Sequence, residues 1–204
     1  KRLEVLSNNY LEKFPKLADD LGIIHPGYNP SFQVTGRISA TNPPATNIPR
    51  EPEIRGMIVS RWKEQGGKIL ALDYRQLEMR LVASEAGEEK MLEIFKGGKD
   101  VHDETAKKMF GPEFTKEQRA IAKNINFGTV YGISPYSLSD KFGVPVRKAE
   151  DFISLHKETF PQIYRWMDGQ HRFIQTHGYA LSRLGQRRHF AGWKDATDYE
   201  KGRI

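Results

Sequence analysis

The strongest constraint on the fold is the stretch 88–177, where helix-forming segments follow one another and glycine or proline interrupts them at intervals. The interruptions are Gly97-Gly98, Gly111-Pro112, Gly143 and Pro161. Such residues end helices or start new ones, so they predict separate helices near residues 88–96, 102–110, 116–131, 135–142, 146–159 and 161–177. The middle of the chain is therefore predicted to be almost wholly helical.

Strands are predicted to be few and short. FQVTGRIS (32–39) alternates, KILALDY (68–74) is a short apolar run typical of a buried strand, and residues 179–190 are typical of two strands around Gly185. Three such segments cannot form an independent sheet. Either they pair across the helical stretch, or their sheet needs strands that this chain lacks. The predicted fold class is α+β, mainly helical.

Two further helices are expected outside this stretch. Residues 1–21 carry a rough apolar stripe, and QLEMRLVASEAG (76–87) has a helical pattern that Gly87 can end. Between the first helix and the run 68–74, three prolines exclude regular structure from residues 41–51.

Composition excludes several classes of protein. The sequence of 204 residues has no cysteine, which rules out disulfides, thiolate metal sites and a cysteine nucleophile. No apolar run approaches the roughly 18–20 residues that cross a membrane, and the polar N-terminus does not resemble a signal peptide. An intracellular protein is expected. The net charge of +6 permits a polyanionic partner without requiring one.

Asp73 lies at the end of the predicted buried strand 68–74. A carboxylate at the end of a strand is a good Mg²⁺ ligand, and the next main-chain carbonyl can add a second oxygen. Asp is also a preferred N-cap, and a helix is predicted to begin a few residues later. The residues alone leave both interpretations open.

A second candidate feature lies within residues 118–132. Arg119, Lys123, Phe127 and Tyr131 recur every four residues, so they form one stripe on a helix. Two cations one turn apart suit a triphosphate, and the aromatic rings beyond them could stack on a sugar and a base. Gly128 would let a flat ligand approach closely. An ordinary amphipathic helix with a solvated basic face explains the same pattern.

Taken together, these segments resemble the polymerase motifs of family A DNA polymerases, the group of bacterial DNA polymerase I and its phage relatives. DYRQLEMR (73–80) is similar to motif A, DYSQIELR, and RAIAKNINFGTVYG (119–132) is similar to motif B, RxxxKxxNFGxxYG. Two flanking segments also resemble the family, in the correct order. Before motif A stand TGRIS (35–39) and NIP (47–49), and between the two motifs stands KDVH (99–102). The resemblance covers about residues 25–204.

The resemblance implies part of a right-hand polymerase fold. Residues 1–24 would be a remnant of the thumb or a connector helix, and 25–87 the part of the palm with motif A. Residues 88–178 would be helical fingers with motif B, and 179–204 a hairpin and the start of the return to the palm.

The resemblance also implies roles for site residues. Asp73 would be catalytic and bind both Mg²⁺ ions, helped by the Tyr74 carbonyl. Arg119, Lys123 and His102 would hold the β- and γ-phosphates, with Lys123 able to protonate the leaving pyrophosphate. The other implied nucleotide contacts are Phe127 on the sugar, Tyr131 near the templating base, Glu78 as a steric gate against ribose, and Gln76. The implied DNA contacts are Arg37, Asn47, Arg187 and Arg188.

The sequence departs from the family pattern in several places. His102-Asp103-Glu104 spells the letters of the family's motif C, but it precedes motif B, so Asp103 and Glu104 are expected to be exposed residues in the first turn of a helix. Motif C is missing, and with it the second metal-binding carboxylate. Arg75 replaces a small Ser, and Gln186 interrupts a GRRR-like run.

These observations imply a template-directed DNA polymerase that adds deoxynucleotides to a primer 3′ end in the cytoplasm of a bacterium or a phage-infected host. Its partners would be primer-template DNA and deoxynucleoside triphosphates, without a membrane. A second chain or a further C-terminal segment would complete the palm. A nucleotide- and DNA-binding fragment without turnover, and a relative of single-subunit RNA polymerases, are the alternatives.

Overall fold

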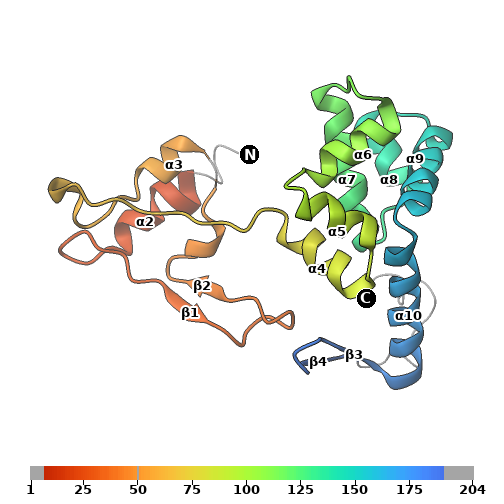
Figure 1. The fold of residues 1–204 in the computed structure, drawn as a ribbon. Helices are drawn as coiled ribbons and strands as arrows, with labels where there is room; N and C mark the ends of the chain where they lie inside the picture. Colours follow the sequence, from red (N-terminus) through yellow and green to blue (C-terminus); the bar gives the residue numbers. More distant parts are fainter. Residues whose placement is uncertain (1–6, 50, 191–204) are drawn as a thin grey trace. The chain divides into compact units, whose positions relative to one another are not determined.

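The structure, a computed structural model, describes residues 7–49 and 51–190. The chain divides into two compact units, Lys1–Asp73 and Tyr74–Ile204, which are described separately (Figure 1). The beginning of the predicted N-terminal helix and the proposed return to the palm in 191–204 lie outside the described residues.

The first unit is built from short elements. A π-helical turn, η1 (Ser7–Leu11), and α2 (Lys13–Lys16) replace the continuous helix predicted for 1–21. The hairpin β1 (Gly27–Asn29) and β2 (Ser39–Thr41) is antiparallel, with Tyr28 opposite Ala40. It is followed by η2 (Ala45–Asn47), α3 (Pro52–Gly56) and η3 (Lys63–Gln65). Only a few apolar side chains are buried here, among them Phe14, Ala40 and Ile54.

Two strand predictions in this unit are wrong. Residues 32–38 form the turn between β1 and β2, and only Ser39 of the predicted strand is in a ladder. Residues 68–74 form no strand in the described chain, and Leu70 and Leu72 are 80% and 85% exposed. A strand is stabilised by hydrogen bonds to a neighbouring strand. An apolar run alone therefore specifies neither the pairing nor the burial of a strand.

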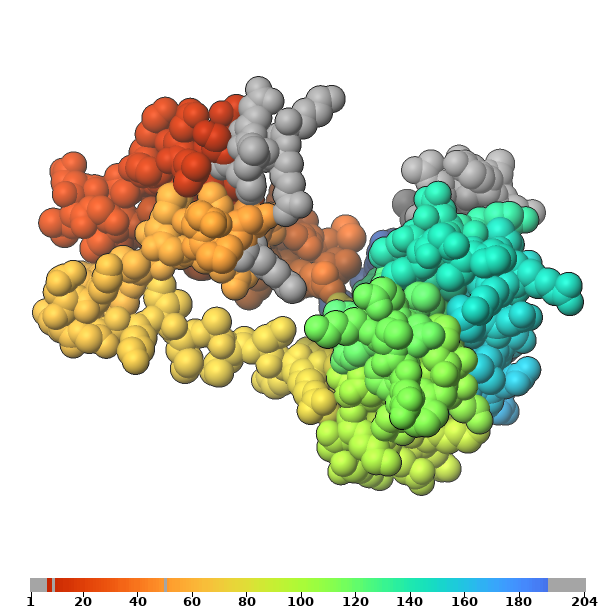
Figure 2. All heavy atoms as spheres, turned by 90° about the horizontal axis from the view of Figure 1, so that it is seen from above, coloured from red at the N-terminus to blue at the C-terminus, as the bar shows by residue number. Residues whose placement is uncertain are grey.

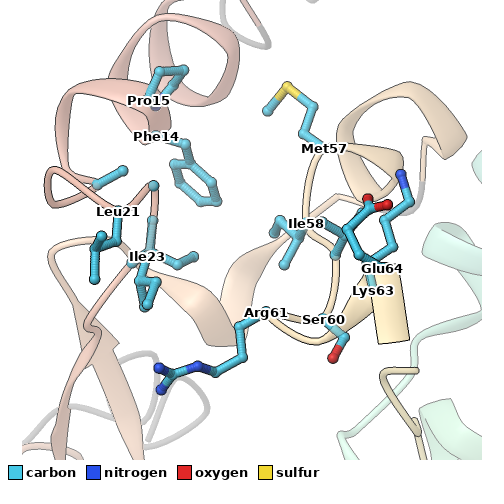
Figure 3. A pocket seen from close by; sticks show the side chains of 14 residues that line it. Phe14, Pro15, Leu21, Ile23, Met57, Ile58, Ser60, Arg61, Lys63 and Glu64 are labelled. Atoms are coloured by element: carbon cyan, nitrogen blue, oxygen red, sulfur yellow. The ribbon is translucent and has the colours of Figure 1, made fainter. Parts of the chain in front are cut away.

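The first unit also contains a hollow of about 780 Å³, lined by apolar side chains and by Ser60, Arg61, Lys63 and Glu64 (Figure 3). Phe14, Leu21 and Ile23 line one side, and Met57 and Ile58 line the other. The hollow belongs entirely to the first unit.

The second unit is helical and confirms the predicted pattern. Its helices are α4 (Leu77–Ala86), α5 (Glu89–Lys96), α6 (Val101–Phe110), α7 (Lys116–Val130), α8 (Pro135–Phe142), α9 (Val146–Thr159) and α10 (Pro161–His177). Gly87 ends α4 with a φ of 64°, in the left-handed region that glycine tolerates. Thr115 and Gln118 form a reciprocal capping box that begins α7.

Two apolar clusters hold these helices together. One joins α4, α5, α6 and α10 through buried side chains that include Met79, Met91, Phe95 and Phe160. The other joins α7, α8 and α9 through Ile121, Ile125, Leu138, Ala149 and Phe152. Seen from above, the green residues of α6 and α7 lie against the turquoise residues that follow them (Figure 2). Helix α7 is therefore fixed on one face by its neighbours.

A buried carboxylate stabilises the start of α10. Glu88 is 2% exposed, and its Oε2 accepts a hydrogen bond of 2.9 Å from the main-chain N–H of Gln162. A negative charge is favourable at a helix N-terminus, where N–H groups lack partners within the helix. This contact connects the α4–α5 turn to a helix more than seventy residues later.

The unit ends in the predicted hairpin, β3 (Tyr179–Leu181) and β4 (Arg187–His189), with Ala180 opposite Arg188. The mainly helical α+β fold class, with two short antiparallel sheets in the described residues, is thus confirmed. In residues 7–49 and 51–190, no helix combines the length and the apolar character needed to cross a membrane.

Candidate functional site

Helix α7 has one buried face and one face with the predicted cationic and aromatic stripe. Ile121, Ala122 and Ile125 are 7%, 0% and 0% exposed, as expected for the core-facing side. On the other side, Lys123 is exposed and Tyr131, the residue after the helix, is 70% exposed. The core contacts of α7 therefore fix the direction in which the stripe points.

The stripe receives side chains from two other helices. The His102 ring of α6 lies 5.2 Å from the Phe127 ring, and Lys123 Nζ lies 5.9 Å from the centre of the same ring. At the far end, the Tyr131 hydroxyl donates a hydrogen bond of 3.3 Å to Glu78 Oε2 of α4. Five of the predicted site residues are thus brought together within the second unit.

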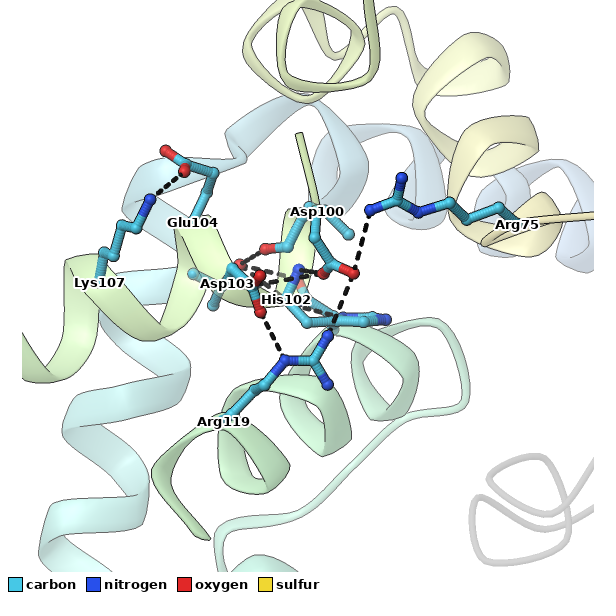
Figure 4. A network of polar contacts seen from close by, with 10 residues as sticks. Arg75, Asp100, His102, Asp103, Glu104, Lys107 and Arg119 are labelled. Carbon is cyan, nitrogen blue, oxygen red and sulfur yellow. Dashed lines mark hydrogen bonds and ion pairs between the residues drawn. The ribbon is translucent and has the colours of Figure 1, made fainter. Parts of the chain in front are cut away.

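Arg119, the first cation of the stripe, is held by two carboxylates of α6 (Figure 4). Its Nε donates to Asp103 Oδ1 at 2.5 Å, and its Nη2 donates to Asp100 Oδ2 at 3.1 Å. Arg75 approaches the same Asp100 oxygen at 3.7 Å. Arg75, which replaces the Ser of the family pattern, therefore forms an ion pair with the start of α6.

Asp100 has two functions in this cluster. Its Oδ1 accepts hydrogen bonds from the N–H groups of His102 and Asp103, which caps α6. Burial raises the pKa of Asp100, but hydrogen bonds from Gln76 and from these N–H groups outweigh it and leave the pKa below the usual value. The Oε1 atom of Gln76 is buried without a partner in the described chain. Asp100 is thus charged at neutral pH.

The prediction for the other two acids of α6 is wrong. Asp103 and Glu104 lie in the first turn of the helix as expected, but both are half-buried and paired. Glu104 accepts from Lys107 at 2.7 Å, on a different side of α6 from Arg119 (Figure 4). Sequence analysis did not predict that Asp100 and Asp103 pair with Arg119. One signal could have indicated it: two acids at the start of one predicted helix, and an arginine with no nearby acid partner in the stripe of the next.

His102 is a neutral side chain at physiological pH. Burial lowers its pKa to about 4, and the nearby cations Arg119 and Lys123 act in the same direction. The carboxylates of Asp100 and Asp103 oppose this shift but do not overcome it. His102 can therefore contribute hydrogen bonds to a ligand at this site, but not a positive charge.

Gly128 leaves room for the side chain of Ile133. A Cβ atom built on it would lie 2.6 Å from Ile133 Cδ1 and 2.8 Å from Ile133 Cβ. Contacts this short would force the turn after α7 to move. Glycine is needed here so that Ile133 can pack against the end of the helix, which is sufficient reason for it without a ligand.

Asp73 and Tyr74 stand at the junction of the two units. Both are exposed, in the segment without regular structure before α4, and Gln76 rather than Asp73 is the residue that precedes the helix. The structure thus contradicts the N-cap interpretation of Asp73. No cluster of three or more metal-binding side chains occurs in residues 7–49 and 51–190. The juxtaposition of Asp73 with α7 stays a prediction.

The four predicted DNA contacts lie on exposed surfaces. Arg37 is in the β1–β2 turn and Asn47 ends η2 in the first unit. In the second unit, Arg187 lies over the Tyr179 ring at 5.1 Å and Arg188 over the Phe190 ring at 5.1 Å. Their role as DNA contacts stays a prediction.

The family model for DNA polymerase family A matches residues 1–203. The chain therefore belongs to DNA polymerase family A.

Individual relatives agree with this assignment. DNA polymerase I of Chloroflexus aurantiacus is 36% identical over 193 residues, which is 92% of this chain and 20% of the relative. The thermostable DNA polymerase I of Thermus filiformis is 36% identical over 197 residues, which is 93% of this chain and 23% of the relative. The chain thus spans less than a quarter of the length of these relatives.

A solved structure is similar along nearly the whole chain. The polymerase domain of Pol1 from M. smegmatis, in complex with DNA primer-template and dNTP, matches with a TM-score of 0.82 and 26% identity. The match covers 98% of this chain and 36% of that one. The fold described above is therefore that of part of a polymerase domain.

Proposed function

We propose that this chain is the nucleotide-binding part of a DNA polymerase that extends a primer 3′ end, copying a template. The observation that carries the proposal is the arrangement on α7. Two cations, a neutral histidine and two aromatic side chains lie along one face, in the order that a triphosphate, a sugar and a base require. Membership of family A and the polymerase-domain fold support the same function.

Each residue would then act on one part of the nucleotide. Arg119, Lys123 and His102 would hold the β- and γ-phosphates, Phe127 would pack on the deoxyribose, and Tyr131 would lie near the templating base. Glu78 would exclude a ribose 2′-hydroxyl, and its contact with Tyr131 would hold its carboxylate in place. The primer hydroxyl would form a bond to the α-phosphate, and the bond to the β-phosphate would break to release pyrophosphate.

Phosphoryl transfer of this kind requires bound Mg²⁺, and this chain would supply some of its ligands. The exposed Asp73 carboxylate and the Tyr74 main-chain carbonyl are oxygen donors of the kind that Mg²⁺ prefers. When bound, the metal would lower the pKa of the primer hydroxyl and neutralise charge on the phosphates. Asp73 is one carboxylate, and a two-metal site needs a second. Gln76 would contact the nucleotide. The DNA contacts would be Arg37, Asn47, Arg187 and Arg188.

Primer extension tests this function and separates it from nucleotide binding without turnover. The protein is incubated with primer-template DNA, the four deoxynucleoside triphosphates and Mg²⁺, beside the variant Asp73→Asn. We expect the unsubstituted protein to extend the primer and the Asp73→Asn variant to fail to do so. Binding of nucleotide and DNA without extension would favour the fragment without turnover, and equal use of ribonucleotides would favour an RNA polymerase.

Phe127→Tyr should make the enzyme accept chain terminators. The added hydroxyl would stand beside the sugar and could replace the missing 3′-hydroxyl of a dideoxynucleotide. Discrimination against dideoxynucleotides should therefore fall by at least tenfold, which corresponds to about 1.4 kcal/mol. The measurement is the ratio of incorporation efficiencies for the two nucleotides. An unchanged ratio would place Phe127 away from the sugar.

Asp103→Asn should strengthen nucleotide binding. In the free protein Asp103 occupies the Nε–H group of Arg119 and adds a negative charge where the triphosphate would bind. Removing that charge should raise the affinity for a deoxynucleoside triphosphate by about threefold to tenfold at low salt. The measurement is fluorescence anisotropy of a labelled nucleotide.

Glu104→Gln is the matched control for Asp103→Asn. It removes the same charge from the neighbouring residue, whose partner is Lys107 rather than Arg119. It should leave the affinity almost unchanged. Weaker binding by Asp103→Asn would show that Asp103 orients Arg119 for the ligand instead of competing with it.

A further inference from the structure

A buried chain of polar side chains runs through four helices and ends at His102. The Tyr164 hydroxyl of α10 lies 2.9 Å from His156 Nδ1 of α9, and His156 Nε2 lies 3.0 Å from Asn126 Oδ1 of α7. Asn126 Nδ2 in turn lies 3.2 Å from His102 Nδ1 of α6. Asn126 and His156 are 0% and 1% exposed, so water cannot replace these partners.

Thr105 decides the direction in which these hydrogen bonds run. Its hydroxyl lies 2.8 Å from the Val101 carbonyl and 3.2 Å from Asn126 Oδ1, and its single proton goes to the nearer acceptor, Val101. Its Oγ1 is then left to accept from Asn126 Nδ2 at 3.0 Å. The amide nitrogen of Asn126 therefore faces both Thr105 and His102. Its oxygen faces His156.

This orientation fixes the protons on both imidazole rings. An amide nitrogen only donates, so His102 Nδ1 must accept and carries no proton. Since His102 is neutral, its single N–H is on Nε2. His156 is neutral as well, because burial lowers its pKa to about 4. Its Nε2–H donates to Asn126, and its Nδ1 accepts from Tyr164.

We propose that Asn126, backed by His156 and Tyr164, is a positioning residue that holds His102 as the neutral tautomer with its proton on Nε2. No hydrogen bond from the described part of the chain reaches that nitrogen, and it is not among the buried side-chain atoms without a partner there, so it reaches the surface of this buried residue and is left for a ligand. Resting on the proposed function, this ligand is a phosphate oxygen. Arg119 and Lys123 supply the positive charge, and His102 supplies one directed hydrogen bond. Because His102 is neutral, Asp100 and Asp103 cannot form an ion pair with it and compete with the ligand.

The tautomer is measurable in the unsubstituted protein. Long-range ¹H–¹⁵N spectra of protein labelled with ¹⁵N-histidine distinguish a protonated from an unprotonated ring nitrogen, and His102→Gln identifies the His102 signals by their loss. We expect an unprotonated Nδ1 and a protonated Nε2 at neutral pH. A proton on Nδ1, or an exchanging mixture of the two forms, would overturn the proposal, because the chain of hydrogen bonds would then run in the opposite direction.

Asn126→Asp reverses the last bond without changing the shape of the side chain. A carboxylate only accepts, so the single proton of His102 should move to Nδ1, and the ring should bind a second proton more readily. Its proton affinity should rise at least tenfold, which is about 1.4 kcal/mol. Asn124→Asp on the same helix is the matched control, since Asn124 contacts Ala120 and Lys141 and not His102. An unchanged His102 in Asn126→Asp would overturn the role of Asn126.

Adding inorganic tripolyphosphate to the same sample separates this inference from the proposed function. A change in the His102 Nε2 signal alone is expected if that nitrogen binds phosphate. The expected tautomer without any response to tripolyphosphate would support the positioning role and contradict the phosphate contact. The tautomer in the unsubstituted protein decides the inference even where Asn126→Asp does not fold.

Discussion

Arg119→Ala should weaken binding of a deoxynucleoside triphosphate by about 10- to 150-fold, because a charge-assisted hydrogen bond contributes about 1.5–3 kcal/mol. The loss should lie at the upper end of this range. Asp100 and Asp103 would remain beside the ligand without the cation that now neutralises them. The affinity is measured by titrating a labelled nucleotide at constant salt.

Arg147→Ala is the matched control for this prediction. Arg147 is an exposed cation of α9, the helix that packs through Ala149 and Phe152 on the buried face of α7. Its loss should change the affinity less than twofold, and Lys123→Ala should behave like Arg119→Ala. Equal effects of Arg147→Ala and Arg119→Ala would mean that the nucleotide senses only net charge.

Lowering the pH from 6.5 to 4 should destabilise the protein through its two buried histidines. Each has a pKa of about 4 in the folded protein, against 6.5 in the unfolded chain. In this range the unfolded chain binds more protons, so stability is complete above pH 6.5 and falls as the pH approaches 4. The free energy of unfolding should decrease by on the order of 3 kcal/mol for each histidine. Urea unfolding at several pH values measures it.

His156→Gln isolates one of these contributions. The variant should be less stable at pH 7, because it breaks the buried hydrogen bonds to Asn126 and Tyr164, but its stability should depend less on pH between 6.5 and 4. His171→Gln changes an exposed histidine of α10 and should keep the original pH dependence. A His156→Gln protein with an unaltered pH dependence would show that His156 is charged or solvated in the folded state.

The sequence predicted the helical unit well because its signals are local. Gly87 and Gly143 take the left-handed backbone that ends a helix, and the capping residues Thr115 and Ser134 begin α7 and α8. The run 68–74 could not be predicted in the same way. Its apolar residues indicate a buried strand, but pairing depends on a partner far along a chain or on another chain, and no local pattern encodes it.

The candidate site was predicted in part. A four-residue spacing places Arg119, Lys123, Phe127 and Tyr131 on one face of α7, and the structure confirms that arrangement. The partners of those residues come from packing between helices. The pairing of Arg119 with Asp100 and Asp103, and the path from Tyr164 to His102, depend on how α6, α7, α9 and α10 meet.

Photo-crosslinking tests most directly whether the exposed face of α7 binds a deoxynucleoside triphosphate. A nucleotide with a photoreactive base is bound, irradiated and mapped after digestion with trypsin, which cleaves after Lys123 and Lys141. The label should be found in the peptide 124–141, which contains Phe127 and Tyr131, and excess unlabelled deoxynucleotide should abolish it. A label confined to other peptides, or one that competitor does not reduce, would contradict the proposed site.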